Sequence, residues 1–217
     1  MDAGGRPAVP SAAVLRLYDF LASGNGYKVR LVLTQLGIPF ERVEVDIMHG
    51  GSRTPEFLAM NPNGRIPVLE LEPGVHLAES NAIIWYLANG TPLLPTDPLE
   101  RARVLQWMFF EQYSHEPQIA VARFWIHSLG KRKEWADRLQ EKWQKGYQAL
   151  DAMERHLDGR TFFVGERYSI ADIALYAYTH VAEEGDFDLG RYPNIRAWLD
   201  RVADQPGHVL ITQSEFG

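Results

Sequence analysis

The feature that most constrains the fold is a change of pattern part-way along the chain. Residues 14–90 alternate strand-like and helix-like segments, whereas only helical patterns follow Leu99. Between them, residues 89–98 hold three prolines in ten positions, a composition typical of a linker. We therefore predict an α/β domain followed by an all-α domain.

The first domain is predicted to fold in the order βαβ, helix, ββα. Its first strand–helix–strand unit should be parallel and right-handed. The turn Glu72-Pro73-Gly74 has proline and glycine in the middle positions of a type II turn, which predicts a hairpin. This order predicts a four-stranded mixed sheet with helices on both faces, the thioredoxin-like architecture. The expected elements are strands at 14–20, 40–45, 66–71 and 75–78, and helices at 29–36, at 54–60 and from an N-cap at Ser80.

The second domain contains about five predicted helices. Ser169 and Asp172 have the spacing of a capping box, with aspartate at the third helical position. A long apolar face runs from Trp135 to Leu157, and Pro193 opens the last helix. The predicted boundaries are a flexible tail at 1–12, a thioredoxin-like domain at 13–92, a linker at 93–98 and an all-helical domain at 99–217.

Composition excludes several classes of function. The 217-residue chain has no cysteine, which excludes disulfides, cysteine-ligated metals and thiol nucleophiles. Its 22 basic and 28 acidic residues give a net charge of −6, which disfavours nucleic-acid binding. No apolar run approaches a membrane span, and the N-terminus lacks the apolar core of a signal peptide. The absence of a membrane span and of a signal peptide leads us to expect a cytoplasmic protein with no membrane association. The histidines lack metal-ligand spacing, so we also expect no metal.

The missing thiol raises a question about chemistry. In the thioredoxin architecture the working thiol lies in the turn after the first strand. Here that turn, residues 21–26, contains Ser23 and no cysteine. If this site performs sulfur chemistry, the sulfur must arrive with a ligand.

Six short stretches stand out along the chain: Ser23-Gly24-Asn25, Lys28-Val29-Arg30, Pro55-Glu56-Phe57-Leu58, the segment 61–69, the segment 77–83 and Ser169-Ile170-Ala171-Asp172. No single one of them is decisive, but all occur in order at the spacings of one family. Through them nearly the whole chain, from about Val14 to the last helix, resembles the soluble glutathione transferase family, and its serine-type (theta- and phi-like) branches best.

The resemblance implies that Ser23 is the catalytic residue and holds the sulfur of glutathione as a thiolate. A hydroxyl at a helix N-terminus can stabilise an anion with help from the helix dipole. The alternative is that Ser23 only caps the helix. Tyr18 is a rival, because other branches use a tyrosine at this strand. Asn25, as a turn residue or as a thiolate neighbour, is another.

The resemblance also implies a set of glutathione-binding residues. Ile66–Pro67 would be a cis peptide whose preceding backbone pairs with the cysteinyl part of glutathione, the alternative being a trans proline that starts a strand. Glu79 and Ser80 would hold the γ-glutamyl end at a helix N-terminus, where Ser80 is also the expected N-cap. Asn25 at the first turn is a further candidate. Ser52 and Arg53 match positions near the glycyl carboxylate and Arg65 a position that is often glutamine, but the two arginines could equally be ordinary surface residues.

A second substrate would contact the helical domain. The stretch 109–117 is unusually polar and aromatic for a helix, and Pro117 should kink or break it. Ordinary core or interface packing is an equally good explanation. The candidate pocket or interface residues are Trp107, Phe110, Glu111, Tyr113 and Arg123, together with Tyr18.

The expected function is conjugation of the glutathione thiolate to a small hydrophobic electrophile by a cytoplasmic homodimer. One alternative is another glutathione-dependent reaction in the same site, such as ether cleavage, dehalogenation or isomerisation. Another is a non-catalytic binding module of the same fold. Nothing in the sequence identifies the electrophile.

Overall fold

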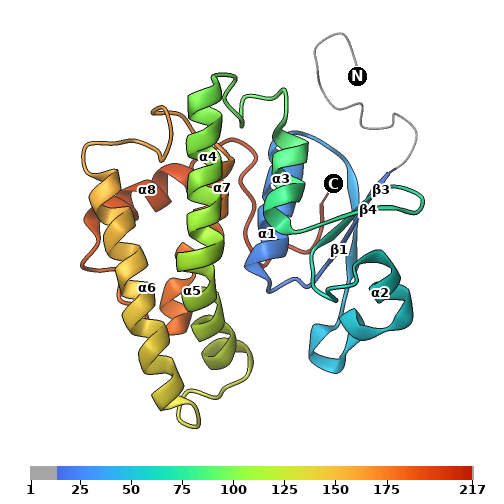
Figure 1. Ribbon diagram of the computed structural model, residues 1–217, viewed down its shortest axis with the longest axis horizontal. Coiled ribbons are helices and arrows are strands. Elements are labelled where there is room, and N and C mark those ends of the chain that lie inside the picture. Colours follow the sequence, from blue (N-terminus) through green and yellow to red (C-terminus); the bar gives the residue numbers. More distant parts are fainter. Residues whose placement is uncertain (1–13, 217) are drawn as a thin grey trace. The chain divides into compact units, whose positions relative to one another are not determined.

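The computed structural model describes residues 14–216 and contains two compact units. One unit comprises the chain up to Leu94 together with the residues from Pro206 onward, and the other comprises Pro95–Gln205. Figure 1 shows the elements of both. The tail predicted at 1–12 lies outside the described residues.

The N-terminal unit is built on one four-stranded mixed sheet in the order β2-β1-β3-β4. β1 pairs in parallel with β2 and antiparallel with β3, and β3 forms the predicted hairpin with β4. This confirms the predicted thioredoxin-like architecture. The strands are β1 (Leu15–Asp19), β2 (Phe40–Glu44), β3 (Val68–Glu72) and β4 (Val75–Ala78).

Helices α1 (Gly24–Gln35) and α3 (Ser80–Ala88) contact each other. α1 ends at Gln35, with Leu36 as its C-cap and then Gly37, whose φ of 64° suits glycine. The other helical segments are α2 (Pro55–Met60) and the short 3₁₀ turns Ile47–His49 and Gly51–Arg53.

The N-cap prediction for Ser80 is wrong by one residue. Glu79, with φ of 68°, is the cap, and Ser80 is the first residue of α3. The hydroxyl of Ser80 donates instead to Oδ1 of Asn25 on α1, at 3.1 Å. A tertiary hydrogen bond therefore replaces the local cap that sequence alone favours.

The second unit is helical, as predicted. The break expected near Pro117 is a π-helical turn over Glu111–His115, after which α5 begins with the proline in its first turn. Proline has no amide hydrogen to donate, so a change of helix type is a natural result there. The α-helices are α4 (Pro98–Phe110), α5 (Glu116–Arg123), α6 (Ala136–Leu157), α7 (Ile170–Thr179) and α8 (Pro193–Ala203).

The last residues depart from the predicted domain division, which placed 99–217 together. From Pro206 onward the chain groups with the N-terminal unit and forms neither helix nor strand as far as residue 216. The reason is long-range bonding: Tyr27 and Arg30 of α1 donate to backbone carbonyls in this segment. Figure 1 shows the segment running beside α1.

Candidate functional site

Three segments of the N-terminal unit meet at the boundary of the sheet where β1 and β4 end and β3 begins, called the shared edge below. Val68 at the start of β3 pairs with Tyr18 near the end of β1 and with Ala78 at the end of β4. The turn that leaves β1, the residues before β3 and the entrance of α3 must therefore lie at the same edge. This edge gathers most of the residues that the sequence singled out.

Ser23 is the N-cap of α1, with extended backbone angles, and is half-buried. Its Oγ atom accepts a hydrogen bond from the amide of Gly26 at 3.3 Å. This bond uses a lone pair of the oxygen and not the hydroxyl hydrogen. The first turn of α1 itself has no acidic residue, although the carboxyl group of Asp19 lies against Gly26 in that turn.

A buried polar cluster joins the N-termini of α1 and α3. The Nζ atom of Lys28 donates to Oδ1 of Asn25 at 2.9 Å, and to Oγ of Ser80 and Oδ1 of Asn81 at 3.4 Å each. Ser80 also donates to Asn25. Because an ammonium group only donates, the oxygen of the Asn25 amide must face Lys28, and its nitrogen lies on the other side.

Lys28 has no role in the predicted site, although it stands in a motif of the resemblance. Its side chain has no exposed surface, and neither does that of Arg30 two residues later. A signal was present: both cations stand among the apolar residues of α1, where charged side chains are rare unless they are paired. The partners, however, come from distant segments.

The hydroxyl group of Tyr18 is already engaged in a hydrogen bond with another side chain. It donates to a carboxylate oxygen of Glu70 at 3.2 Å. Burial, followed by the charge of Glu70, raises the pKa of Tyr18. Its ring packs on the cluster of Val45, Phe57 and Val68, whereas the next residue, Asp19, faces α1.

The Ile66–Pro67 peptide is cis, and Pro67 is buried. Ile66 packs on the same apolar cluster as Tyr18, which holds this turn against the sheet. Ile66 and Pro67 directly precede β3, where Val68 pairs with Tyr18 and Ala78.

The remaining polar candidates lie on the neighbouring loops. Ser52 is buried, and Nη1 of Arg53 donates to the carbonyl of Asn63 at 3.0 Å. This brings the 3₁₀ turn at 51–53 against the loop that leads into Pro67. Arg65 is exposed, and its backbone carbonyl accepts a hydrogen bond from Nδ2 of Asn61 at 2.8 Å.

Glu79 combines an exposed side chain with φ of 68°, a conformation uncommon for a residue other than glycine. Within residues 14–216 its side chain makes no capping bond to α3. The first amides of α3 therefore point toward the edge without a side-chain cap, an arrangement suited to an anion.

The helical candidates differ in their surroundings. The rings of Trp107 and Phe110 contact each other at 5.1 Å between centroids, while Arg123 pairs with Glu184 at 2.6 Å. Glu111 is fully buried and accepts from its neighbour Gln112. Tyr113 is 86% exposed.

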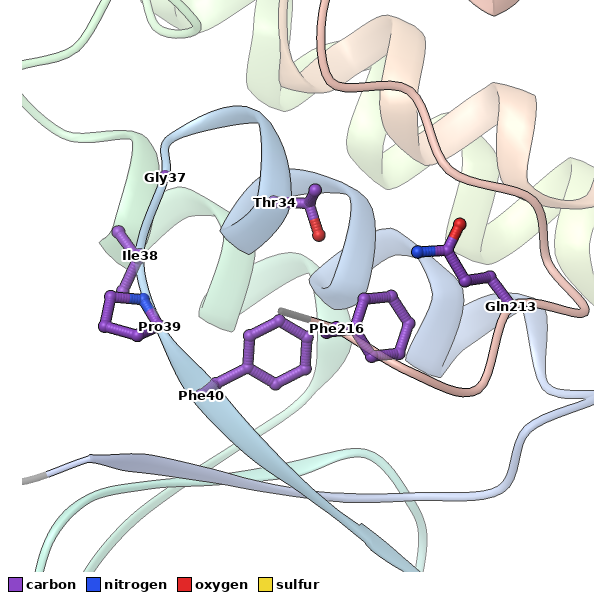
Figure 2. A pocket seen from close by; sticks show the side chains of 7 residues that line it. All are labelled: Thr34, Gly37, Ile38, Pro39, Phe40, Gln213 and Phe216. Atoms are coloured by element: carbon purple, nitrogen blue, oxygen red, sulfur yellow. The ribbon is translucent and has the colours of Figure 1, made fainter.

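One cavity, of about 160 Å³, lies at the opposite end of α1 from Ser23. Figure 2 shows the side chains around it, from the end of α1, the start of β2 and the C-terminal segment. Thr34 and Ser23 are separated by eleven residues of helix, about 16 Å, so this cavity is no part of the edge site. Its lining residues are Thr34, Gly37, Ile38, Pro39, Phe40, Gln213 and Phe216.

Two findings concern residues 14–216 alone. No group of three or more histidine, aspartate or glutamate side chains there could hold a metal ion. In the same range, no helix combines the length and apolar character needed to cross a membrane.

Sequence models of two families match the chain. "Glutathione S-transferase, N-terminal domain" matches residues 13–89, and "Glutathione S-transferase, C-terminal domain" matches residues 113–206. The first match lies in the N-terminal unit and the second, except for Pro206, in the helical unit; neither covers residues 90–112 or the chain after Pro206.

Several known proteins are similar. A crystal structure of glutathione S-transferase from Pseudomonas fluorescens is 54% identical, with a TM-score of 0.91 over 93% of this chain and 100% of that one. The disulfide-bond oxidoreductase YfcG of Escherichia coli is 32% identical over 86% of this chain and 89% of its own length. A glutathione transferase from Burkholderia graminis, solved with two glutathione molecules bound per subunit, is 31% identical, with a TM-score of 0.80 over 91% and 88% of the two chains.

Proposed function

This chain belongs to the glutathione S-transferase family, and from that premise we propose that it conjugates the thiolate of glutathione to a small hydrophobic electrophile. The observation that carries the proposal is the shared edge of the N-terminal sheet. There the half-buried Ser23 hydroxyl, the cis peptide before Pro67 and the N-terminus of α3 converge.

The proposed role of Ser23 is to stabilise the thiolate. A free thiol with a pKa of about 8.5 is only about 3% ionised at pH 7. Lowering that pKa by two units takes about 2.7 kcal/mol. One hydrogen bond to a charged group contributes about 1.5–3 kcal/mol and a helix dipole about 0.5–1 kcal/mol, which together are sufficient.

Asn25 is the alternative donor, and the cluster around it supports that possibility. Lys28 and Ser80 both donate to its amide oxygen, which orients the amide nitrogen away from them. An amide held in this way offers N–H groups to a sulfur anion. Tyr18 is the weaker rival, because its hydroxyl already donates to Glu70.

The γ-glutamyl end of glutathione is proposed to bind at the entrance of α3. Its carboxylate would accept from the first amides of the helix and from the Ser80 hydroxyl, which would then exchange its bond to Asn25 for one to the ligand. Glu79 is exposed at the same point and would pair with the amino group. Ser52, Arg53 and Arg65 would surround the opposite, glycyl end.

Calorimetry with glutathione tests this arrangement. Wild-type protein should bind, and Ser80→Ala should bind about tenfold more weakly, equivalent to about 1.4 kcal/mol. Thr91→Ala is a matched control, since its hydroxyl bonds to backbone groups at the C-terminal end of α3, the carbonyl of Ala88 and the amide of Leu93. Absence of binding by the wild type at millimolar glutathione would refute the proposal.

A second candidate reaction is glutathione-dependent reduction of disulfides, which is favoured by the similarity to a disulfide-bond oxidoreductase. Because the chain has no cysteine, the exchange would run between glutathione and the disulfide alone. The glutathione thiolate would attack one sulfur, form a mixed disulfide and release the other sulfur as a thiolate. A second glutathione would then release the remaining thiol and leave glutathione disulfide.

Turnover assays separate the reactions. Conjugation should consume electrophiles with loss of the free thiol and no glutathione disulfide, whereas disulfide reduction yields glutathione disulfide in proportion to substrate. The protein itself should show no glutathione adduct by mass spectrometry under either reaction. Glutathione binding without turnover of any electrophile or disulfide would favour the binding-module alternative.

We also propose a cytoplasmic homodimer. Phe109 and Tyr113 are 70% and 86% exposed and lie four residues apart, on the same side of α4 and its π-helical extension. Exposed aromatic pairs of this kind are typical of interfaces. Light scattering on wild type and on Phe109→Asp/Tyr113→Asp should show a dimer and a monomer, respectively.

A further inference from the structure

Arg30 of α1 has no exposed surface, and its guanidinium group contacts three separate segments of the N-terminal unit. Nε lies 3.0 Å from Oδ2 of Asp19 at the end of β1. Nη2 donates to the carbonyl of Leu21 at 2.6 Å. Nη1 donates to the carbonyls of Ile211 and Gln213 at 2.9 and 3.2 Å. One side chain thus joins a strand end, the turn after it and the C-terminal segment.

Leu21 belongs to the turn that carries Ser23. The amide of Ser23 donates to the carbonyl of Phe20 at 2.8 Å, and the amide of Phe20 donates to Oδ1 of Asp19 at 2.7 Å. The same carboxylate lies against Gly26, where an added Cβ would stand 1.6 Å from Oδ1. The position of the Ser23 hydroxyl therefore depends on where Asp19 and the Leu21 carbonyl are held.

The C-terminal segment, residues 206–216, is held to α1 through its backbone. The hydroxyl of Tyr27 donates to the carbonyl of Val209 at 2.7 Å, one helical turn before Arg30. The side chains of Val209 and Ile211 are buried. Two side chains on one face of α1 thus fix this segment, and the segment in turn supplies two of the acceptors of Arg30.

We propose that Arg30 is a positioning residue that couples the C-terminal segment to the Ser23 turn. Residues 209–213 hold the guanidinium group in the orientation from which it fixes the carbonyl of Leu21, and so set the placement of Ser23 against the glutathione sulfur. The last part of this statement rests on the proposed function; the coupling itself does not.

The planar fork of arginine is essential to this arrangement. Lysine at position 30 would keep a positive charge near Asp19, but its compact ammonium group could not reach the separate carbonyls that Nη1 and Nη2 bind in the plane of the guanidinium group. Arg30→Lys therefore separates the charge of the side chain from its geometry. Tyr27→Phe removes only the hydroxyl that anchors Val209, and leaves Arg30 and its bond to Leu21 in place. It is the milder variant if Arg30→Lys does not fold.

Two measurements on the full chain test the proposal. The first is amide hydrogen exchange at residues 20–24, which needs no ligand. The second is the pKa of bound glutathione, followed by thiolate absorbance against pH. Val32→Ala is the control: it removes buried apolar atoms from the same helix and no hydrogen-bonding group.

In Arg30→Lys we expect exchange at residues 20–24 to be about tenfold faster and the thiol pKa to rise by about one unit. Tyr27→Phe should move both in the same direction by less, while glutathione affinity changes little in either variant. Val32→Ala should change neither.

Unchanged exchange at residues 20–24 in both Arg30→Lys and Tyr27→Phe would overturn the coupling, as would an equal change in Val32→Ala. If the wild type fails to bind glutathione, the proposed function fails, but the exchange experiment still decides whether Arg30 couples the two segments.

Discussion

Helices α1 and α7 each begin with a serine N-cap, and each has a buried aspartate within four residues of that serine. At α7, Ser169 donates to Oδ2 of Asp172, which also accepts from the Ser169 amide. At α1, Ser23 accepts from Gly26, and Asp19 pairs with Arg30 instead of with the serine. Ser169 is 2% exposed, whereas Ser23 is half-buried.

The difference lies in what else the aspartate contacts. Asp172 also receives hydrogen bonds from the amide of Phe163 and from Nε1 of Trp198, so its donors all serve the interior of the helical unit. Asp19, in contrast, pairs with Arg30, and the hydroxyl of Ser23 lies at the shared edge of the sheet. On the proposed function, the same local signal, serine before a helix, serves stability in one unit and ligand chemistry in the other.

The largest effect expected from this comparison follows from Asp172→Ala. The change leaves several buried donors without an acceptor, and each such group costs about 1–3 kcal/mol, so the free energy of unfolding should fall by about 4 kcal/mol. Denaturant titration measures this. Glutathione affinity of the folded fraction should stay within about threefold of wild type, an interval of about 0.6 kcal/mol; a selective loss of affinity would erase the distinction between the two helix starts.

Ser23→Ala should show the opposite profile. Removing the hydroxyl should raise the pKa of bound glutathione by about one to two units, from the 1.5–3 kcal/mol of a hydrogen bond to a charged group. Turnover should fall more than affinity, and stability should change by about 1 kcal/mol or less. Thiolate absorbance against pH is the measurement. If the thiol pKa and turnover stay at wild-type values, Ser23 is only a cap and Asn25 becomes the leading donor.

Both buried aspartates make the stability of the protein depend on pH, but over different ranges. Burial raises the pKa of Asp19 to about 7 against the opposing charge of Arg30, and raises that of Asp172 to about 6. Arg42 also opposes the rise at Asp19, and Glu44 adds to it. Both values exceed the ordinary pKa of about 3.9, so the folded state binds more protons than the unfolded state between about pH 4 and 7.

The stability that protonation of Asp19 contributes is therefore fully present below about pH 4 and is lost as pH rises through about 7. Asp19→Asn should remove this part of the pH dependence, a change in slope of about 1 kcal/mol per pH unit. Denaturant titrations from pH 5 to 7.5 measure the slope, which is independent of the overall loss of stability. Identical slopes in variant and wild type would contradict the raised pKa.

Ser169→Ala is expected to have the smallest effect. Loss of this cap should cost about 1 kcal/mol of unfolding free energy, with bound-thiol pKa and glutathione affinity unchanged. Thermal unfolding together with calorimetry provides the check. A shift in thiol pKa comparable to that of Ser23→Ala would show that the two serines are not separate in function.

Much of the fold follows from local patterns. The strand and helix order of the first unit, the parallel pairing of β1 with β2 and the hairpin at Gly74 are all confirmed. The capping box at Ser169 and Asp172 is confirmed as well. Each depends on residues close together in sequence, whose periodicity, turn chemistry or capping can be recognised without knowledge of the tertiary fold.

The sequence by itself also determined that any sulfur in the site belongs to a ligand, because the chain has no cysteine. It placed Ser23 at a helix start and Pro67 before a strand. Only the tertiary structure decided that Ser80 bonds to Asn25 across two helices, and that Lys28 and Arg30 are buried. These features join residues up to 183 positions apart, as in the bond from Arg30 to Gln213. No local pattern encodes such a pairing, because a buried cation is stable only where distant acceptors converge on it.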